Sequence, residues 1–347
     1  MSVATQSPET DLLIPRPAPG EQWDSHTVHT HYFGFNIPEH AIGTFAYIRY
    51  MPALGVCHAG FQAYQGLDNV VVADCLHHDY QIGCDYPDDD GARFTANGLT
   101  FDFVNPGKAA QITYRSADGR CRVDVRAEAI TPLAARGHVI PGEELHTAQA
   151  PGGSEQFMHY TGELELDGQT YTVDCNAARD RSWRQVRTET LEANAHPPVM
   201  WTPVYFGPDL AFNQVGFAAP DSNPLWLDAH RIPDGAPTHH FAWVSVDGEI
   251  RDVVRVHRQD LELHPLTFAP LKTLIDAEDE TGREYTFLGE AIGHAPLSAW
   301  PNIVAFETLF RWEDDRGRVA YGPGQSIWNH VSQKAMRAKA AVRRDRA

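Results

Sequence analysis

The sequence contains little of what a disulfide-linked, zinc-binding or membrane-spanning protein needs. Its 347 residues include five scattered cysteines and no C-x-x-C pair, which excludes a zinc ribbon and a thioredoxin-type motif. We interpret the cysteines as reduced, buried thiols. A catalytic cysteine is the alternative, although no neighbouring base supports it. No segment approaches the ~20 apolar residues of a membrane-spanning helix.

Basic residues are also scarce. Lys and Arg number 28 against 46 Asp and Glu, so the formal net charge is −18 at pH 7. Such a field repels nucleic-acid phosphates and anionic lipid headgroups, and we expect neither as a partner. Residues 1–20 lack a basic region ahead of an apolar run and do not resemble a secretory signal. We therefore expect a cytoplasmic protein, of an oligomeric state that the sequence leaves open.

Short segments with period-two alternation make up most of the chain. Residues 121–127 (CRVDVRA) alternate apolar and charged side chains. β-Prone segments flank 167–168 and 247–248, both Asp-Gly, which is the strongest short-range hairpin signal. Roughly sixteen such segments, without an alternating helix pattern, predict an all-β fold of barrels or sandwiches. Further expected strands are 44–51, 56–64, 70–73, 101–104, 110–114, 200–206, 225–232, 285–288 and 303–310.

Breaks in this pattern give the expected domain organisation. The length exceeds the roughly 250–300 residues that one core usually supports, and residues 194–198 (NAHPP) interrupt the strand pattern. We therefore predict one barrel over 23–193 and a second over 194–330. Residues 1–22 are Pro-rich and predict an extended tail, and 331–347 predict a basic tail or frayed helix.

The most unusual local string is Arg179-Asp180-Arg181-Ser182-Trp183, directly after an expected strand. A carboxylate among arginines is most often held in structural ion pairs. The functional alternative is an acid at a barrel mouth, with Trp183 as a hydrophobic or cation-stabilising wall.

This string resembles the R-D-x-S-W-G-x-R signature of the hydroxyneurosporene synthase-like (carotenoid 1,2-hydratase-like) superfamily, which includes tocopherol cyclase-like and fungal decalin-forming cyclase relatives. Residues 31–36 and 43–50 are similar to its first domain and 317–324 to its last strands. Arg184 stands where the signature has glycine. The resemblance implies two lipocalin-like β-barrels packed side by side. It also implies hydration, isomerisation or cyclisation of unsaturated, largely apolar substrates without an organic cofactor.

Several of the 18 histidines are candidates for acid–base chemistry. His159, in the strand before the central hairpin, is expected to partner Asp180, with a core or surface histidine as the alternative. His58 and the pair at 239–240 are second choices.

Two further histidine groups are candidates for a metal site. These are His26, His29 and His31, and the His-His-Asp string at 77–79. No Cys/His spacing in the chain matches a closed metal site, so we expect no metal and no other cofactor.

Together with these residues, the resemblance implies a cofactor-independent lyase (hydratase), isomerase or cyclase that acts on a hydrophobic, terpenoid-like small molecule. Asp180, assisted by His159, would protonate an alkene or polarise a leaving hydroxyl, and Trp183 would shelter the cation. An acid of this kind must keep its proton, which burial favours and adjacent arginines oppose. The residues expected to bind substrate are Arg179, His58, Trp201, Tyr205 and Asn213.

Two other classes remain open. The first is a lipocalin-like carrier of a hydrophobic ligand without turnover. The second is a metal-dependent enzyme that uses the N-terminal histidines.

Overall fold

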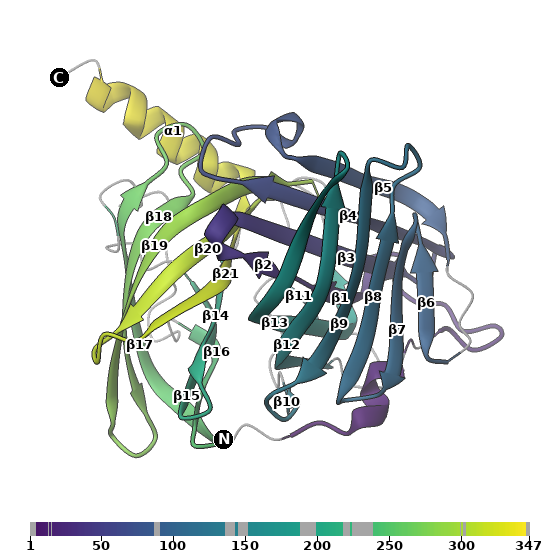
Figure 1. Ribbon diagram of the computed structural model, residues 1–347, viewed down its shortest axis with the longest axis horizontal. Helices are drawn as coiled ribbons and strands as arrows, with labels where there is room; N and C mark the ends of the chain where they lie inside the picture. Colours follow the sequence, from purple (N-terminus) through teal and green to yellow (C-terminus); the bar gives the residue numbers. More distant parts are fainter. Residues whose placement is uncertain are drawn as a thin grey trace. The chain divides into compact units, whose positions relative to one another are not determined.

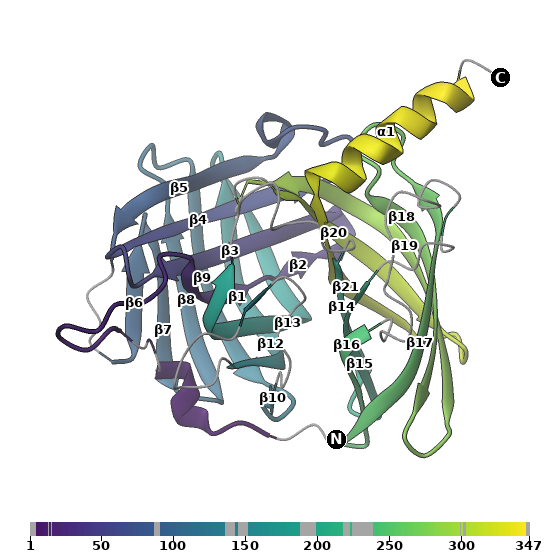
Figure 2. The same cartoon turned by 180° about the vertical axis from the view of Figure 1, so that it is seen from behind.

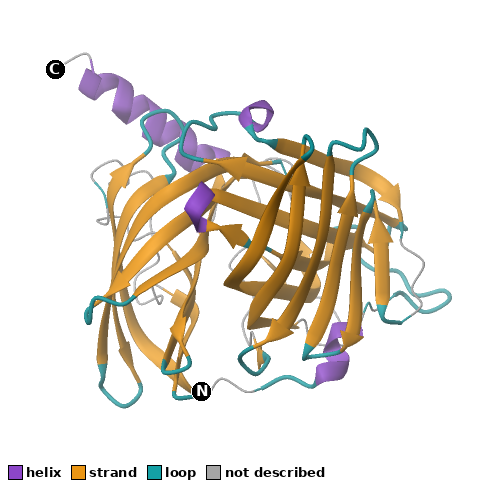
Figure 3. Ribbon diagram, in the orientation of Figure 1, coloured by secondary structure: helices purple, strands orange, loops and turns teal. Residues whose placement is uncertain are grey.

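The computed structural model of the chain consists mainly of antiparallel strands (Figure 3). It describes residues 5–12, 14, 16–86, 91–135, 143–144, 152–187, 199–217, 223, 239–298, 300 and 303–344. The chain divides into an N-terminal unit (Val3–Val139 and Glu143–Arg187) and a C-terminal unit (Thr188–Ala347). The predicted fold class, all-β with two antiparallel barrels, is confirmed. The predicted boundary at 193–194 lies outside the described residues and stays a prediction.

The N-terminal unit is a near-closed barrel of ten strands in the order β5-β4-β3-β1-β13-β12-β9-β8-β7-β6 (Figure 1). The short strands β2, β10 and β11 pair with β3, β12 and β13. The element bounds are η1 Pro8–Leu12, β1 Thr27–Phe33, β2 Asn36–Ile37, η2 Pro38–His40, β3 Ile42–Met51, β4 Val56–Gln65, η3 Val72–Asp74, β5 His77–Asp85, β6 Arg93–Ala96, β7 Leu99–Asn105, β8 Ala109–Arg115, β9 Cys121–Ala129, β10 Ala134–Ala135, β11 Glu143–Glu144, β12 Gly152–Leu166 and β13 Gln169–Arg187.

Two-residue turns connect key hairpins of this barrel. Asp167 and Gly168 have φ values of 50° and 82° and join β12 to β13 as predicted. Asn97 and Gly98, at 46° and 72°, join β6 to β7. Positive φ at both central positions is the turn geometry that matches strand twist, and Asn, Asp and Gly adopt it readily.

Side chains link the edge strand β5 and its neighbour β4 to the turn after the other edge strand, β6, and to β8, where the backbone ladder ends. The Asn97 amide donates to the Ala59 carbonyl at 3.1 Å and to the Asp79 carboxylate at 3.0 Å. The Tyr114 hydroxyl donates to the same carboxylate at 2.8 Å. Asp79 therefore holds the seam of the barrel together.

Two segments of this unit differ from the sequence-based expectations. Residues 70–73, expected as a strand, lead into the 3₁₀ turn η3. The Asp74 carboxylate accepts hydrogen bonds from the backbone amides of Val70 and Val71, both at 2.9 Å, which favours a turn. The expected tail contains the 3₁₀ turn η1 near the β7–β8 connection (Figure 2), where the Gly107 amide donates to Asp11.

The C-terminal unit is a closed barrel of eight consecutive strands, β14 to β21 (Figure 1). The predicted Asp247-Gly248 turn joins β16 to β17. The expected strand 225–232 lies outside the described residues. The element bounds are β14 Val199–Gly207, β15 Leu210–Phe217, β16 His239–Val246, β17 Glu249–Leu263, β18 Pro270–Asp279, β19 Glu284–Leu297, β20 Ile303–Asp314, β21 Val319–Asn329 and α1 His330–Arg344.

The C-terminal helix α1 is anchored to this barrel rather than frayed. The Asn329 side chain accepts a hydrogen bond from the Ser332 amide at 2.8 Å, which caps the first turn. Met336 is fully buried in a cluster that includes Phe306 and Trp328. No helix of the described chain is long and apolar enough to cross a bilayer.

The C-terminal unit buries polar groups as well as apolar ones. Arg258 donates to Asp260 at 3.0 Å and to Thr202 at 2.8 Å, all three being buried. His294 is fully buried, 3.2 Å from the Thr267 hydroxyl. Burial, with a smaller effect of His264, lowers the pKa of His294 from 6.5 to about 3.

We predict that His294 makes the protein less stable in acid. Its folded-state pKa is depressed, so between about pH 6.5 and 3 the unfolded chain binds a proton that the folded chain does not. Its contribution to stability is complete above pH 6.5 and falls as the pH falls. The free energy of unfolding of His294→Phe, relative to that of the parent, should therefore rise by about 2–3 kcal/mol when the pH is lowered from 7.5 to 4.5. Urea unfolding at the two pH values measures this. If the unfolding free energies of variant and parent differ by the same amount at both pH values, the prediction is wrong.

Candidate functional site

The pleat of β13 divides the motif at 179–183 between two faces of the sheet. Side chains alternate along a strand, and β13 pairs with β1 on one side and β12 on the other. Arg179, Arg181 and Trp183 point into the barrel, where the Arg179 guanidinium lies 5.7 Å from the ring of core residue Phe33. Asp180 and Ser182 point to the outer face. The arginines adjacent to Asp180 in sequence are therefore not its neighbours on that face.

The Arg179 guanidinium is hydrogen-bonded to two side chains inside the barrel. It forms a two-point ion pair with Asp11, with nitrogen–oxygen distances of 2.8 and 3.0 Å, and both side chains are buried. It also donates to the Gln156 side-chain oxygen at 2.7 and 2.9 Å. The predicted substrate-binding role of Arg179 stays a prediction, whereas its visible role is to anchor η1.

Trp183 and Arg184 form an irregularity in β13. A Cβ atom on Gly152, directly opposite, would lie 2.4 Å from the Trp183 ring, so only glycine leaves room for it. Arg184 has a φ of 55°, the left-handed region that glycine favours. The Arg184 amide donates to His29 at 2.8 Å, and its guanidinium lies 3.9 Å from the Trp23 ring centroid.

On the outer face, Asp180 belongs to a straight row of directly paired residues. Glu155 on β12 pairs with Asp180, Asp180 with Tyr32 on β1, and Tyr32 with Tyr47 on β3. Directly paired residues have Cβ atoms about 4.5–5.5 Å apart. We call these four residues the acid row. Glu155, Tyr32 and Tyr47 are buried, and Asp180 is partly buried.

The neighbouring row on this face is also polar. Ser182 pairs with Thr30, with their hydroxyl oxygens 2.7 Å apart. Thr30 pairs with Arg49, and Arg49 with His58. The structure thus brings two predicted residues, Asp180 and His58, to one face, three strands apart. At ~4.8 Å per strand the separation across the strands is about 14 Å, and the two residues are also offset by one row along the strands.

The protonation states at this face follow from burial. Burial, with a smaller effect of Arg49, lowers the pKa of His58 to about 4, so it is neutral at pH 7. Burial raises the pKa of Tyr47, and Asp180 acts in the same direction, while Arg187 and Arg49 oppose it. Tyr47 therefore keeps its proton and can donate a hydrogen bond.

Aromatic rings lie along the acid row. The Phe45 ring centroid is 5.4 Å from that of Tyr32 and 5.1 Å from that of Tyr47. Tyr47 stacks on Tyr80 at 6.3 Å. Gly34 makes this possible, because a Cβ there would lie 2.0 Å from the Tyr32 hydroxyl. The face thus combines carboxylates with an aromatic surface.

The other predicted catalytic residues do not join Asp180. His159 pairs with Asn176, with 3.0 Å between its Nδ1 and the amide oxygen, and lies 3.5 Å from Asp174. Asn176 is four residues from Asp180, or about 13 Å along the strand. Trp183 lies on the opposite face.

The predicted binding residues Trp201, Tyr205 and Asn213 belong to the C-terminal unit. Trp201 and Asn213 are buried and hydrogen-bonded, with the indole nitrogen donating to the amide oxygen at 3.0 Å. They alternate with core residues Val204 and Phe212 and so face outward from that barrel. Burial, together with Asp209, raises the pKa of Tyr205.

Neither histidine group forms a metal site. His26 contacts Asp24 at 3.0 Å, His29 accepts the Arg184 amide, and His31 Nδ1 lies 3.1 Å from the Tyr50 hydroxyl. Across the described ranges, no group of three or more His, Cys, Asp or Glu is arranged to hold a metal ion. The side chains at 239–240 lie outside the described residues.

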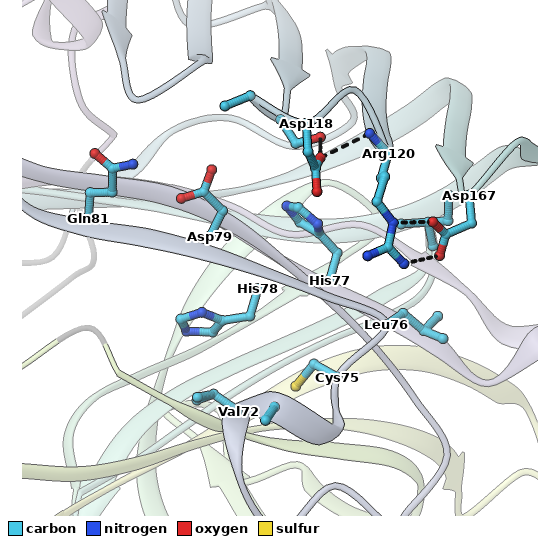
Figure 4. Close-up of a pocket in the computed structure, with 14 residues that line it drawn as sticks. Val72, Cys75, Leu76, His77, His78, Asp79, Gln81, Asp118, Arg120 and Asp167 are labelled. Carbon is cyan, nitrogen blue, oxygen red and sulfur yellow. Dashed lines mark hydrogen bonds and ion pairs between the residues drawn. The ribbon is translucent and has the colours of Figure 1, made fainter.

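A cavity of about 490 Å³ lies beside β5 in the N-terminal unit. Figure 4 shows His77 between Asp79 and Asp118, with Arg120 paired to Asp167. His77 contacts the Tyr114 hydroxyl at 2.9 Å, and that hydroxyl donates to Asp79. These contacts serve the barrel seam and two turns, so we assign the cavity a structural role.

The cysteines are free thiols. Burial raises the pKa of Cys57, Cys75, Cys121 and Cys175 to about 12. Because the thiolate is the reactive form, these four cysteines are poor nucleophiles at neutral pH.

Glu155, Tyr47 and Arg49 lie at the candidate site but were not predicted from the sequence. The string Phe45-Ala-Tyr47-Ile-Arg49 carried a usable signal, because alternate residues of a strand share a face. Glu155 carried none, since only the β12–β13 register places it opposite Asp180.

Fold and site together define a two-barrel, all-β protein with an acidic and aromatic face on one sheet. The chain belongs to the family described as Domain of unknown function (DUF7064), whose model matches residues 16–330. No curated protein matches the chain.

Three solved structures are similar to this chain at low sequence identity. CghA has a TM-score of 0.55 at 10% identity, covering 91% of this chain and 94% of its own, and this likeness shows the fold. Kievitone hydratase from Nectria haematococca has a TM-score of 0.49 at 11% identity, covering 90% and 92%. An AttH-like protein from Nitrosomonas europaea has 0.48 at 12%, covering 91% and 99%.

We predict that Asp11→Asn destabilises the protein by about 3–5 kcal/mol, because it leaves the buried Arg179 without its counter-charge. Urea unfolding measures this. The control is Asp167→Asn, which removes an exposed partner of Arg120 and should change stability little. The double variant Asp11→Leu/Arg179→Met should recover most of the loss. Equal effects of Asp11→Asn and the control would show that the buried pair is not the anchor.

Proposed function

We propose that the protein is an acid–base enzyme that hydrates, dehydrates or isomerises an apolar, unsaturated small molecule at the acid row. The observation that carries this proposal is the direct pairing of Glu155 and Asp180 beside the rings of Tyr32, Phe45 and Tyr47.

Two carboxylates at directly paired positions repel each other when both are ionised. Partial burial strengthens that repulsion, and sharing one proton relieves it. In this proposal Glu155 and Asp180 act as such a pair, and one of them donates a proton to the substrate.

In hydration, the carboxyl proton is transferred to one alkene carbon and leaves a cation on the other. A water oxygen then bonds to the cationic carbon, and the water returns one proton to the carboxylate, so the acid is regenerated. Elimination is the reverse, and loss of a proton from an adjacent carbon completes an isomerisation. The ring faces of Tyr32, Phe45 and Tyr47 replace Trp183 as the stabilising aromatic surface.

The other polar groups have defined tasks in this proposal. Tyr47 stays protonated and donates to a substrate oxygen. His58 is neutral and accepts a hydrogen bond or a proton at the far end of the ligand. The resemblance of residues 179–184 to the hydroxyneurosporene synthase-like signature implies the same class of reaction.

The test is solvent deuterium incorporation into a panel of terpenoid alkenes and tertiary alcohols, followed by mass spectrometry. Wild type should label at least one compound, and Asp180→Asn should reduce the rate by roughly 10²–10⁴, the usual contribution of a positioned acid. Glu155→Gln should have an effect of similar size.

The matched controls are Asp174→Asn and Glu163→Gln, exposed carboxylates on the same two strands. Both should retain full labelling. A folded wild type that binds these compounds without labelling any would instead favour a carrier, and full labelling by Asp180→Asn would remove Asp180 from the mechanism.

A further inference from the structure

We propose that the interior of the N-terminal barrel binds a carboxylate with an apolar body, held by Arg181. This site lies on the face of β13 opposite to Asp180. It is therefore separate from the acid row, and it involves binding without a chemical step.

The central observation is a fully buried guanidinium without a hydrogen-bond partner. Arg181 is 1% exposed, and its three side-chain nitrogens have no partner among the residues that the structure describes. Ser154, which pairs directly with Arg181 on β12, is also 1% exposed, and its hydroxyl likewise has no described partner. Two adjacent buried side chains thus offer donors to the same interior region.

The charges around Arg181 leave one positive charge in excess. Asp11 is the attractive charge with the largest effect on Arg181, but both of its carboxylate oxygens are engaged by Arg179. Asp180 also attracts Arg181, but from the opposite face of the sheet. Burial lowers the pKa of Arg181 to about 10, so it remains charged at neutral pH. An anion beside Arg181 would balance this buried charge, which is otherwise unfavourable.

The donor arrangement suits a carboxylate. A planar guanidinium binds a carboxylate through two parallel hydrogen bonds, and the Ser154 hydroxyl can supply a third. His31, which pairs with Arg181 on β1, adds no competing charge. Burial first, and then Arg181 and Arg179, lower its pKa well below 6.5, with only the Asp11 backbone as a notable opposing group.

The surroundings favour an apolar body on that carboxylate. The Arg181 guanidinium lies 5.3 Å from the Trp183 ring centroid. His31 stacks on Phe94 at 5.4 Å and lies 5.3 Å from Phe103. A strongly hydrated inorganic anion would lose its water here with few donors in return, whereas an aromatic or alkyl body gains contact with these rings.

The test compares 3-phenylpropionate with 3-phenylpropan-1-ol, which share the apolar body and differ in the carboxylate. Calorimetric titration of wild type at pH 7.5 should show saturable binding of the acid at least tenfold tighter than of the alcohol. Absence of saturable acid binding up to about 10 mM, a very weak affinity, would overturn the proposal. So would equal affinity for the two probes, or competition by chloride or sulfate at concentrations that leave the alcohol unaffected.

Variants test the assignment to Arg181. Arg181→Met should weaken acid binding at least tenfold, leave alcohol binding unchanged, and keep or raise the melting temperature, because it removes an unpaired buried charge. Arg181→Lys should also lose most of the affinity, since it keeps the charge without the two-point geometry.

Ser154→Ala is a milder variant and should weaken acid binding severalfold. The control is Arg126→Met on β9, whose guanidinium is about half exposed beside Glu128; it should bind like wild type. Unchanged acid binding in folded Arg181→Met would overturn the assignment. Because these readouts measure binding and not labelling, they can fail or succeed independently of the proposed enzyme activity.

Discussion

The alternation of side chains along β13 is the constraint on which the rest of the N-terminal unit depends. This strand runs for 19 residues between β1 and β12. Its odd-numbered residues around the motif enter the barrel, and its even-numbered residues form the outer face. A five-residue string that looks like one constellation in sequence is therefore two, with arginines and tryptophan on one side and Asp180 and Ser182 on the other.

The two faces of β13 carry different charged side chains. Inside the barrel, Arg179 is paired with Asp11, and the buried Arg181 guanidinium has no hydrogen-bond partner among the described residues. On the outer face, Glu155 and Asp180 bring two acidic groups to paired positions. Placing cations and acids on opposite sides of one strand separates Asp180 from Arg179 and Arg181. Two other arginines, Arg49 and Arg187, act with Asp180 on Tyr47 at the outer face.

The sequence was sufficient to predict the all-β fold and several hairpins, because these depend on local signals. Asp167-Gly168 and Asp247-Gly248 form the expected turns, since their φ values suit Asp and Gly. The expectation of a strand at residues 70–73 was wrong, because the Asp74 carboxylate accepts hydrogen bonds from two backbone amides and so favours a turn.

The site was less predictable because it depends on long-range register. β1 lies beside β13 although about 150 residues separate them, and this pairing places Tyr32 next to Asp180. The β12–β13 register places Glu155, not His159, opposite Asp180. Neither pairing is encoded in a local pattern. The identity of the motif was therefore visible in the sequence, while its chemical partners were not.

A crystal structure with a bound terpenoid tertiary alcohol tests the central claim most directly. The account predicts that the ligand lies on the outer face of β1, β3 and β13, with its hydroxyl oxygen within hydrogen-bond distance of Asp180 or Glu155 and its hydrocarbon against Tyr32, Phe45 and Tyr47. A ligand seated instead against Trp183 inside the barrel, or in the cavity beside His77, would contradict it.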